Sequence, residues 1–274
     1  MYSENVTFVI FTYNEEARIE RAVRNFGRSG QVLVVDNHST DRTREVAEKA
    51  GARILVHKNP GWVEDENTVS SVKAAVTTPW IYWGFADEMI DAPTMAVILE
   101  TIASGDCSII NIARKNYYYG KFCQGAYADT LNRVFIKSAI DFIGNTIHSF
   151  GRPTVPESAI RRLDPSRYFV HHFISDTAGI YFRKINIYSD VESKIGPSDT
   201  VLKIALGAMK GFLGNYIFRK GCKGGLSCFF FVVQQVYYRV LVNMKRYEAN
   251  QGLNFATIEE RNNVVRDQLL RTFK

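Results

Sequence analysis

Residues 6–15 read Val6-Thr7-Phe8-Val9-Ile10-Phe11-Thr12-Tyr13-Asn14-Glu15. The first six are apolar or β-branched, and a run of this length that ends in polar residues is typical of a buried strand. From residue 15 to residue 26, apolar positions recur every three or four residues, which indicates an amphipathic helix. A buried strand, a polar turn and a covering helix together form the repeating unit of an α/β sheet.

The same unit repeats along the next hundred residues. Ser39-Thr40-Asp41 supplies N-cap chemistry for a second helix, and Gly51 ends that helix. Short apolar strands that alternate with helices predict a mostly parallel sheet covered by helices on both faces. Further strands are expected at residues 32–35, 52–57, 80–85 and 107–112, and further helices at residues 39–49, 64–76 and 93–105.

The composition excludes several classes of protein. The 274 residues are 46% apolar, 13% aromatic and 23% charged, which is too apolar for a disordered chain. Four cysteines without a CxxC pair are too few for a disulfide scaffold, and we expect them as reduced thiols. The first residues have neither a basic region nor a long apolar run, so no secretory signal is expected.

The net charge of +6 is concentrated near the C-terminus. Residues 200–247 contain no Asp or Glu. The remaining 26 basic residues of the chain are balanced by 28 acidic ones, so the rest of the chain is slightly acidic. The sequence therefore predicts a globular domain over residues 1–198 and a basic helical segment over residues 199–274. The basic residues of the stretch are Lys203, Lys210, Arg219, Lys220, Lys223, Arg239, Lys245 and Arg246.

This segment is also strongly apolar. The run Phe229-Phe230-Phe231-Val232-Val233 suits a membrane better than a hydrated nucleic-acid groove. A spanning helix needs about 20 apolar residues, whereas the best window, residues 226–242, contains Gln234, Gln235 and Arg239. We therefore expect amphipathic helices in the interface of an anionic membrane, where each basic side chain contributes on the order of 1 kcal/mol. A buried helical subdomain with a basic rim is the alternative.

Polar clusters stand where three of the predicted strands end. In parallel sheets, ligands bind at the carboxyl ends of the strands, so these clusters are the candidate site. No GxGxxG follows the first strand and no GxxxxGK[ST] occurs, which disfavours a nicotinamide dehydrogenase and a P-loop kinase. The clusters are Thr12-Tyr13-Asn14-Glu15, Asp36-Asn37-His38, and Asp87-Glu88 with Asp91.

These clusters resemble family 2 glycosyltransferases of the GT-A fold. The similarity rests on Phe-Thr-Tyr-Asn-Glu-Glu at residues 11–16, Val-Val-Asp-Asn-His-Ser-Thr-Asp-Arg-Thr at residues 34–43 and Ala-Asp-Glu at residues 86–88. It looks most like the branch that adds sugars to bacterial lipopolysaccharide cores and related surface glycans. The resemblance implies a GT-A catalytic domain over residues 1–198, with a mostly parallel sheet flanked by helices, and a membrane-associated helical extension over residues 199–274.

The resemblance assigns nucleoside contacts to the first two clusters. Thr12, Tyr13, Glu15 and Asp36 would bind the nucleoside of a nucleotide sugar. Tyr13 would stack on the base, and Asp36 would accept one of its N–H groups. The alternative for Asp36 is a simple loop cap, because Asp commonly accepts hydrogen bonds from backbone N–H groups two or three residues on.

The third cluster matches the metal-binding Asp-x-Asp motif of the family. Asp87 stands at the position that binds the metal directly, so Mg²⁺ or Mn²⁺ is the expected cofactor, whereas Phe85 replaces the first Asp. Glu88 is a further catalytic candidate beside it. Two acids before a helix that starts with proline are also ordinary complements of the helix dipole.

The catalytic base is expected past the sheet. An inverting transferase needs a group that takes the proton of the acceptor hydroxyl. The family's loop pair matches His148-Ser149, which makes His148 the candidate base or a third metal ligand, and Glu157 is a second candidate. His171 and His172 resemble a family His near the acceptor, and at most one of them can face the site from a strand.

The diphosphate partner departs from the family pattern. The family often has a Lys just before the Asn that matches Asn67, whereas this chain has Glu66. Lys73 or Arg133 is expected to compensate. The aromatic residues Tyr117, Tyr118 and Tyr119 could stack on sugar rings or pack at a strand edge.

Together these expectations describe an inverting transferase that moves a sugar, preferably from a UDP-linked donor, to a lipid-linked or lipopolysaccharide-type glycan. It would be cytoplasmic, peripheral to the inner face of the cell membrane, with an anionic membrane surface and no nucleic acid among its partners. One alternative is a nucleotidyltransferase-like enzyme, which needs a Gly- and Lys/Arg-rich first loop. The other is a degenerate, non-catalytic family member that acts as a membrane scaffold. The oligomeric state is unknown from the sequence.

Overall fold

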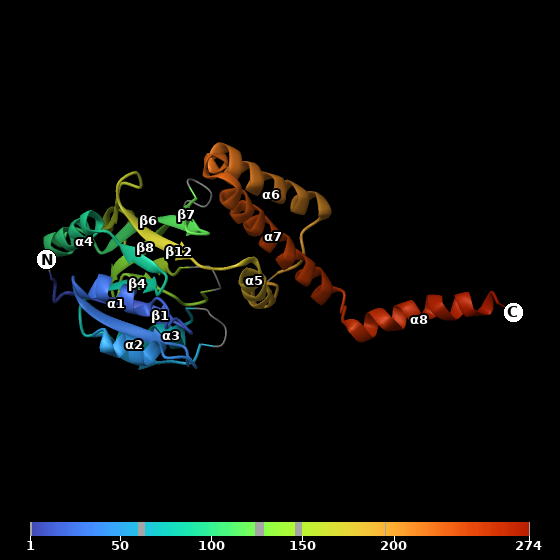
Figure 1. Cartoon of the computed structure of the whole chain (residues 1–274), viewed down its shortest axis with the longest axis horizontal. Helices are drawn as coiled ribbons and strands as arrows, with labels where there is room; N and C mark the ends of the chain where they lie inside the picture. Colours follow the sequence, from blue (N-terminus) through green and yellow to red (C-terminus); the bar gives the residue numbers. More distant parts are fainter. Residues whose placement is uncertain (1, 60–63, 124–128, 146–149, 195, 274) are drawn as a thin grey trace.

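A large mixed sheet with helices on both faces forms the N-terminal part of the molecule, and helices form the C-terminal part (Figure 1). The computed structural model describes residues 2–59, 64–123, 129–145, 150–194 and 196–273. Within these residues the order of the main sheet is β3-β2-β1-β4-β8-β6-β12-β5, with β7 and β11 paired to β6. A separate two-stranded sheet joins β9 and β10.

The strands are β1 (Val6–Thr12), β2 (Gln31–Asp36), β3 (Arg53–Val56), β4 (Trp80–Phe85), β5 (Glu88–Ile90), β6 (Ile109–Tyr118), β7 (Lys121–Phe122), β8 (Thr130–Ile136), β9 (Ile140–Asp141), β10 (Arg152–Pro153), β11 (Ile160–Arg162) and β12 (Phe169–Ile174). The α-helices are α1 (Ile19–Gly27), α2 (Thr43–Lys49), α3 (Glu66–Ala75), α4 (Ala92–Ser104), α5 (Ala178–Glu192), α6 (Val201–Leu213), α7 (Gly225–Asn250) and α8 (Phe255–Arg271). A π-helical turn, Gly214–Phe218, continues α6.

The first four major strands pair in parallel, as the strand and helix pattern predicts. β1 lies between β2 and β4, and β2 pairs with β3. Beyond β4 the sheet is mixed, because β8 runs antiparallel to both β4 and β6. β6 itself runs on to Tyr118, past the expected end at residue 112, and its second half pairs in parallel with β12.

Alternating residues of the strands pack on opposite faces of the sheet. On β1, Phe8 and Ile10 contact the core beneath α1 and α4, whereas Val9 belongs to the core beneath α3. Burial on both faces is why these strands read as continuous apolar runs in the sequence. The two cores hold the strand ends, and hence the candidate site, in a rigid frame.

The first two helices begin later than the periodicity predicts. Residues 13–18 form a loop, in which the Asn14 N–H donates to Ser39 Oγ at 2.9 Å and the Glu15 N–H donates to Thr43 Oγ1 at 2.7 Å. α2 begins at Thr43, whose N–H donates to Asp41 Oδ1 at 3.0 Å. The two strand-end loops therefore hold each other through the hydroxyl groups of Thr43 and of Ser39, the latter being one of the predicted cap residues.

The C-terminal helices leave the sheet after β12. α5 packs against α7, and α6 and α7 lie side by side as a hairpin, whereas α8 extends away from the molecule (Figure 1). In the described residues two helical segments, Val201–Phe218 and Gly221–Asn250, are long and apolar enough to cross a membrane by length and composition. No residue of the first segment, Val201–Phe218, is buried in the structure.

Candidate active site

The predicted nucleoside and metal residues meet at one edge of the sheet. Thr12 pairs with Asp36 across β1 and β2, and Phe11 pairs with Phe85 across β1 and β4. Asp87 follows the end of β4 by two residues. Because all three strands are parallel, their carboxyl ends share the edge at which such sheets bind ligands.

Asp36 organises the loops at this edge. Its carboxylate is fully buried and accepts a hydrogen bond from the Ser39 N–H at 3.0 Å and a longer one from the Thr12 hydroxyl at 3.4 Å. Arg44 Nε lies 3.7 Å from the same carboxylate. Hydrogen bonds from the Ser39 N–H and from Thr12 are those expected if Asp36 caps a loop, which is the alternative to its binding a nucleoside. Tyr13, which follows Thr12, is 41% exposed, and a base could stack on its ring.

Glu15 is paired inside the protein. Arg18 Nη2 donates to Glu15 Oε1 at 2.7 Å, and Arg18 Nη1 lies 3.5 Å from the Phe173 carbonyl oxygen. Burial raises the pKa of the Glu15 carboxyl, although its hydrogen bond and charge interaction with Arg18 oppose that shift. Glu15 therefore orients Arg18 between the first loop and the end of β12.

Asp87 faces one of the two neighbouring histidines. His172 Nε2 lies 3.3 Å from Asp87 Oδ2, and His172 Nδ1 donates to Asn116 Oδ1 at 2.7 Å. His171 contacts the opposite side of the strand, where its ring nitrogens lie 3.0 Å from the Tyr117 hydroxyl and 3.5 Å from Asp91 Oδ2. The two side chains point to opposite faces of β12, as strand alternation predicts, and His172 is the one beside Asp87.

Cationic side chains surround Asp87. Burial alone would raise the pKa of its carboxyl, but the charge and hydrogen bond of His172 and the charges of Arg18 and Lys184 hold that pKa well below its usual range. Lys184 lies on α5, and its Nζ is 2.8 Å from Asp176 Oδ1. Asp87 is therefore ionised at neutral pH.

The donor chemistry at this point fits a divalent cation. A carbonyl oxygen only accepts, so the contact with Asn116 places a proton on His172 Nδ1, and His172 Nε2 faces Asp87 Oδ2. Two lone-pair donors in contact need a proton or a metal ion between them. The described residues contain no group of three or more His, Cys, Asp or Glu side chains placed to hold a metal. A cation held by Asp87 and His172 would need further oxygen ligands from outside this pair, such as those of a phosphate.

Glu88 does not reach the site directly, which corrects the expectation of a catalytic contact. Its side chain is fully buried and accepts from Arg133 Nη2 at 2.5 Å, from the Tyr82 hydroxyl at 3.3 Å and from the Phe85 N–H at 3.2 Å. A carboxylate whose oxygens are all engaged inside the protein positions the turn that carries Asp87. Glu88 is thus a positioning residue.

Glu157 lies at the wrong edge of the sheet for a catalytic base. It precedes β11, whose Ile160 pairs with Ile109 at the start of β6, and its exposed carboxylate forms an ion pair with Arg162. Asn116, beside His172, is seven residues further along β6, which corresponds to roughly 23 Å at 3.3 Å per residue. A proton cannot pass directly over that distance.

The remaining predicted residues have separate fates. Lys73 Nζ donates to the Ile140 carbonyl at 3.0 Å and lies 5.9 Å from the centre of the Phe142 ring, so it is bound to the β9 segment rather than to the Asp87 cluster. His148 lies outside the described residues. The rings of Tyr117 and Phe173 stack at 4.7 Å, which favours packing over sugar stacking for Tyr117.

Sequence reasoning missed Arg18, Asn116, Asp176 and Lys184. Arg18 sits within a segment that reads as helix, and Asn116 lies beyond the expected end of its strand. Lys184 and Asp176 follow the last strand, outside the three motifs. The sequence offers one indication of these residues: a partly buried, ionised Asp87 requires cationic side chains near it.

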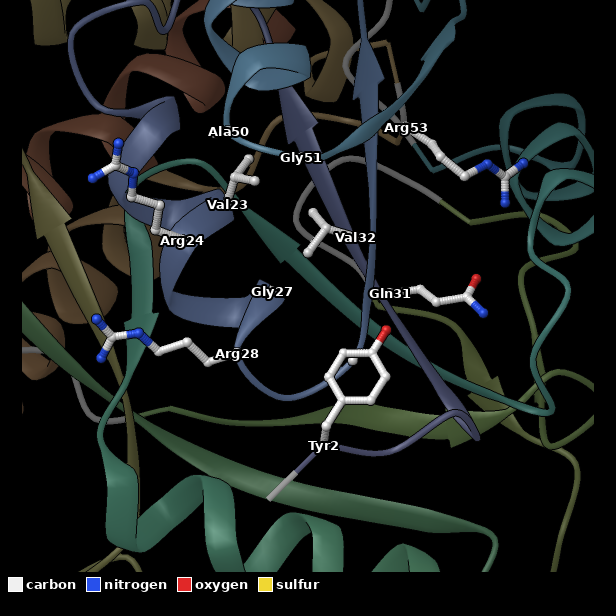
Figure 2. A pocket seen from close by; sticks show the side chains of 11 residues that line it. Tyr2, Val23, Arg24, Gly27, Arg28, Gln31, Val32, Ala50, Gly51 and Arg53 are labelled. Atoms are coloured by element: carbon white, nitrogen blue, oxygen red, sulfur yellow. The ribbon is translucent and has the colours of Figure 1, made fainter.

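The structure also contains a pocket of about 550 Å³ far from this edge, at the amino ends of β1 and β2. It is bordered by Tyr2, Gln31 and three arginines. Figure 2 shows that Arg24, Arg28 and Arg53 point in different directions, so they do not converge on one ligand. We assign no function to this pocket.

Comparison with known proteins gives the family. The family model described as Glycosyl transferase family 2 matches residues 7–187. An uncharacterized glycosyltransferase of Mycobacterium bovis is 31% identical over 105 residues, which cover 38% of this chain and 47% of that protein. One of Rickettsia bellii is 34% identical over 89 residues, 32% of this chain and 29% of that protein. The matches thus span less than half the length of these curated relatives.

Solved structures are similar over more of the chain at low identity. The mannosyltransferase PcManGT from Pyrobaculum calidifontis, in complex with GDP-Man and Mn²⁺, has a TM-score of 0.46 at 13% identity and covers 97% of this chain and 81% of that chain. S. aureus TarS 1-349, in complex with UDP-GlcNAc, has a TM-score of 0.46 at 11% identity, with 92% and 93% covered. The family match itself includes the strands and the strand-end residues described above, and the chain belongs to glycosyl transferase family 2.

Proposed function

We propose that this protein is an inverting glycosyltransferase that moves a sugar from a nucleotide sugar, preferably UDP-linked, to a hydroxyl of a glycan acceptor. The observation that carries the proposal is the pair of Asp87 and His172, with Oδ2 and Nε2 3.3 Å apart at the carboxyl edge of the sheet. An ionised carboxylate and an imidazole nitrogen at this edge suit a nucleotide diphosphate together with a divalent cation.

The side chains at the carboxyl edge of the sheet have different roles in this proposal. Tyr13 stacks on the base, while Asp36 and Thr12 hold the loop that carries it. Asp87 and His172 would hold a Mg²⁺ or Mn²⁺ ion, which would supply positive charge to neutralise the departing nucleotide. Arg18 and Lys184 add positive charge beside Asp87, where the donor phosphates would lie.

In the chemical step the acceptor oxygen forms a bond to the anomeric carbon from the face opposite the nucleotide. The bond between that carbon and the phosphate oxygen breaks, and the nucleoside diphosphate leaves with the electron pair. The acceptor hydroxyl passes its proton to a base, for which we retain His148.

The proposed acceptor is a lipid-linked or lipopolysaccharide-type glycan, and the proposed location is the cytoplasm, at the inner face of the cell membrane. The acid-free stretch of residues 200–247 supports this choice, because its positive charge favours an anionic lipid surface. The nucleotidyltransferase alternative is disfavoured, because the first loop lacks the Gly- and Lys/Arg-rich chemistry that such an enzyme needs.

The test is nucleotide release from a panel of nucleotide sugars with Mn²⁺ or Mg²⁺. We expect release from at least one donor and its loss in Asp87→Asn. Asp91→Asn is the matched control, because Asp91 caps α4 through the Thr94 N–H and Asn preserves a cap. A protein that binds none of the nucleotide sugars would be the non-catalytic scaffold, and the proposal would be wrong.

A further inference from the structure

Both helices of the α6–α7 hairpin expose an apolar stripe. On α6 the residues Leu202, Leu206, Met209 and Leu213 recur at i, i+4, i+7 and i+11, and all are exposed. Positions with this spacing lie on one side of a helix. The same spacing relates four of the exposed residues of α7, which are Leu226, Phe230, Val233 and Tyr237.

Six basic side chains of the hairpin have no carboxylate partner among the described residues. Five of them lie on α6 and at the turn, and the sixth, Arg239, lies on α7. On α7, Lys245 Nζ lies 2.5 Å from Asp190 of α5, and Arg246 lies 4.0 Å from Glu192. These two cations are therefore already neutralised. Among the described residues no carboxylate pairs with the other basic side chains of α6 and the turn, namely Lys203, Lys210, Arg219, Lys220 and Lys223.

The turn of the hairpin is fixed to the catalytic domain. The rings of Tyr118, at the end of β6, and Phe231, on α7, are 5.3 Å apart. Cys123 and Cys228 belong to the same buried cluster. A hairpin that crosses a bilayer must carry its turn to the far side, and this turn is held by the sheet domain on the near side.

The middle of α7 is also fixed, by contacts with α5. The Tyr181 hydroxyl of α5 donates to the Gln234 carbonyl oxygen at 2.7 Å, and the Tyr238 hydroxyl donates to Glu192 at 2.6 Å. A spanning α7 would take these polar contacts into hydrocarbon, where charged side chains are costly. α6 would likewise place Lys210 near the middle of its apolar segment.

We propose that the α6–α7 hairpin lies flat in the headgroup region of an anionic bilayer, with its apolar stripes toward the acyl chains and its unpaired cations on lipid phosphates. The inference deepens the proposed function and rests on it, because a lipid-borne acceptor requires the site to work at a membrane surface. α5 connects the two, since it carries Lys184 beside Asp87 and packs on α7.

α8 provides an internal contrast. It also exposes apolar residues, among them Val265 and Leu269. Its three acidic residues are balanced by three basic ones within the helix, so it has no charge complementarity to an anionic surface. The docking surface is therefore the hairpin and not every exposed helix.

The first experiment measures co-sedimentation of the full chain with phosphatidylcholine vesicles that contain or lack phosphatidylglycerol. We expect binding only to the anionic vesicles. Changing Lys210, Arg219 and Lys223 together to Gln should weaken it about a hundredfold, since each cation near the surface contributes about fivefold. The pair L206Q and F230Q should weaken it about tenfold or more.

The matched control is V265Q with L269Q on α8, which should leave binding unchanged. If the α8 pair reduces binding as much as the hairpin variants do, or if the protein binds neutral vesicles equally well, the proposal is wrong. Self-association through the hairpin without vesicle binding would also contradict it. Circular dichroism of each variant excludes unfolding as the cause.

The second experiment separates a flat hairpin from a spanning one. Cys222 lies in the turn and is the exposed cysteine, whereas Cys107, Cys123 and Cys228 are buried. A membrane-impermeant maleimide added outside the vesicles should label Cys222 of bound protein. Protection that detergent removes would show that the turn has crossed, and would overturn the proposal.

Nucleotide release in solution keeps the two proposals apart. The hairpin variants should release nucleotide from the donor as the unmodified protein does, because none of the changed residues contacts the Asp87 site. Release without vesicle binding contradicts the membrane surface alone. Vesicle binding without release from any donor contradicts the proposed function alone.

Discussion

Of the neighbouring residues His171 and His172, only His172 lies beside Asp87, and the sequence alone could not predict which of the two does so. Strand alternation alone predicts that the two side chains point to opposite faces. Which one meets Asp87 depends on the pairing of β12 between β6 and β5, with His172 opposite Asn116 and Glu88. That register is a tertiary property, so the sequence could identify the pair but not the member.

Glu88 and Arg133 form a buried ion pair, and we predict that Glu88→Gln destabilises the fold. The change leaves the Arg133 guanidinium, which is 1% exposed, without its carboxylate. Loss of one partner of such a pair costs about 3 kcal/mol. The free energy of unfolding in urea measures this.

The matched control replaces both partners with Met. The double variant should be more stable than Glu88→Gln, because no uncompensated charge remains buried. Equal stability of Glu88→Gln and the unmodified protein would mean that the pair does not position the Asp87 turn as described.

The four cysteines should differ sharply in reactivity. Burial raises the pKa of the Cys228 thiol to about 12 and also raises the pKa of Cys107 and Cys123. A raised thiol pKa lowers the thiolate fraction at pH 8, so these three should react slowly. Mass spectrometry should find one maleimide per native chain, on Cys222, and four in denaturant. Rapid labelling of Cys228 would contradict the packing of α7 on the sheet domain.

At the scale of elements, the sequence predicted the parallel part of the sheet well. The strands at residues 6–11, 32–35 and 80–85 agree with β1, β2 and β4, because burial on both faces leaves an uninterrupted apolar run. The helix expected from residue 15 begins at Ile19 because tertiary contacts to Ser39 and Thr43 compete with the first helical turn. Short β5 and the extension of β6 have no such pattern and are set by pairing with β12.

β4 makes a close approach at Gly84, and we predict that Gly84→Ala destabilises the protein. A Cβ there would collide with the buried Tyr82 ring and lie 3.0 Å from Glu88 Oε2. Overpacking of this kind costs about 1–3 kcal/mol. Urea unfolding measures the effect.

Gly207→Ala is the control for Gly84→Ala. Gly207 lies within α6, and nothing lies within 4 Å of a Cβ placed on it. Since Ala favours a helix interior over Gly, this variant should be more stable by about 0.5–1 kcal/mol. If both variants changed stability in the same direction, the close approach at Gly84 would not be the cause.

At the scale of the whole molecule, charged residues are distributed unevenly between the sheet domain and the C-terminal helices. The sheet domain places an ionised Asp87 among Arg18, Lys184 and His172, and the hairpin carries the surplus of positive charge. From motif positions and the charge distribution, the sequence predicts a division of this kind at residue 198. It could not predict that α5 links them, because that link depends on contacts between segments about 50 residues apart, such as Tyr181 with Gln234.

We propose that Asp87 and His172 form the site of sugar transfer. The most direct test compares His172→Gln with His171→Gln in nucleotide release from the best donor at saturating Mn²⁺. We expect a loss of about a hundredfold for His172→Gln, as for a group that holds a catalytic metal ion, and near-normal release for His171→Gln. Equal losses in the two variants, or full activity of His172→Gln, would contradict it.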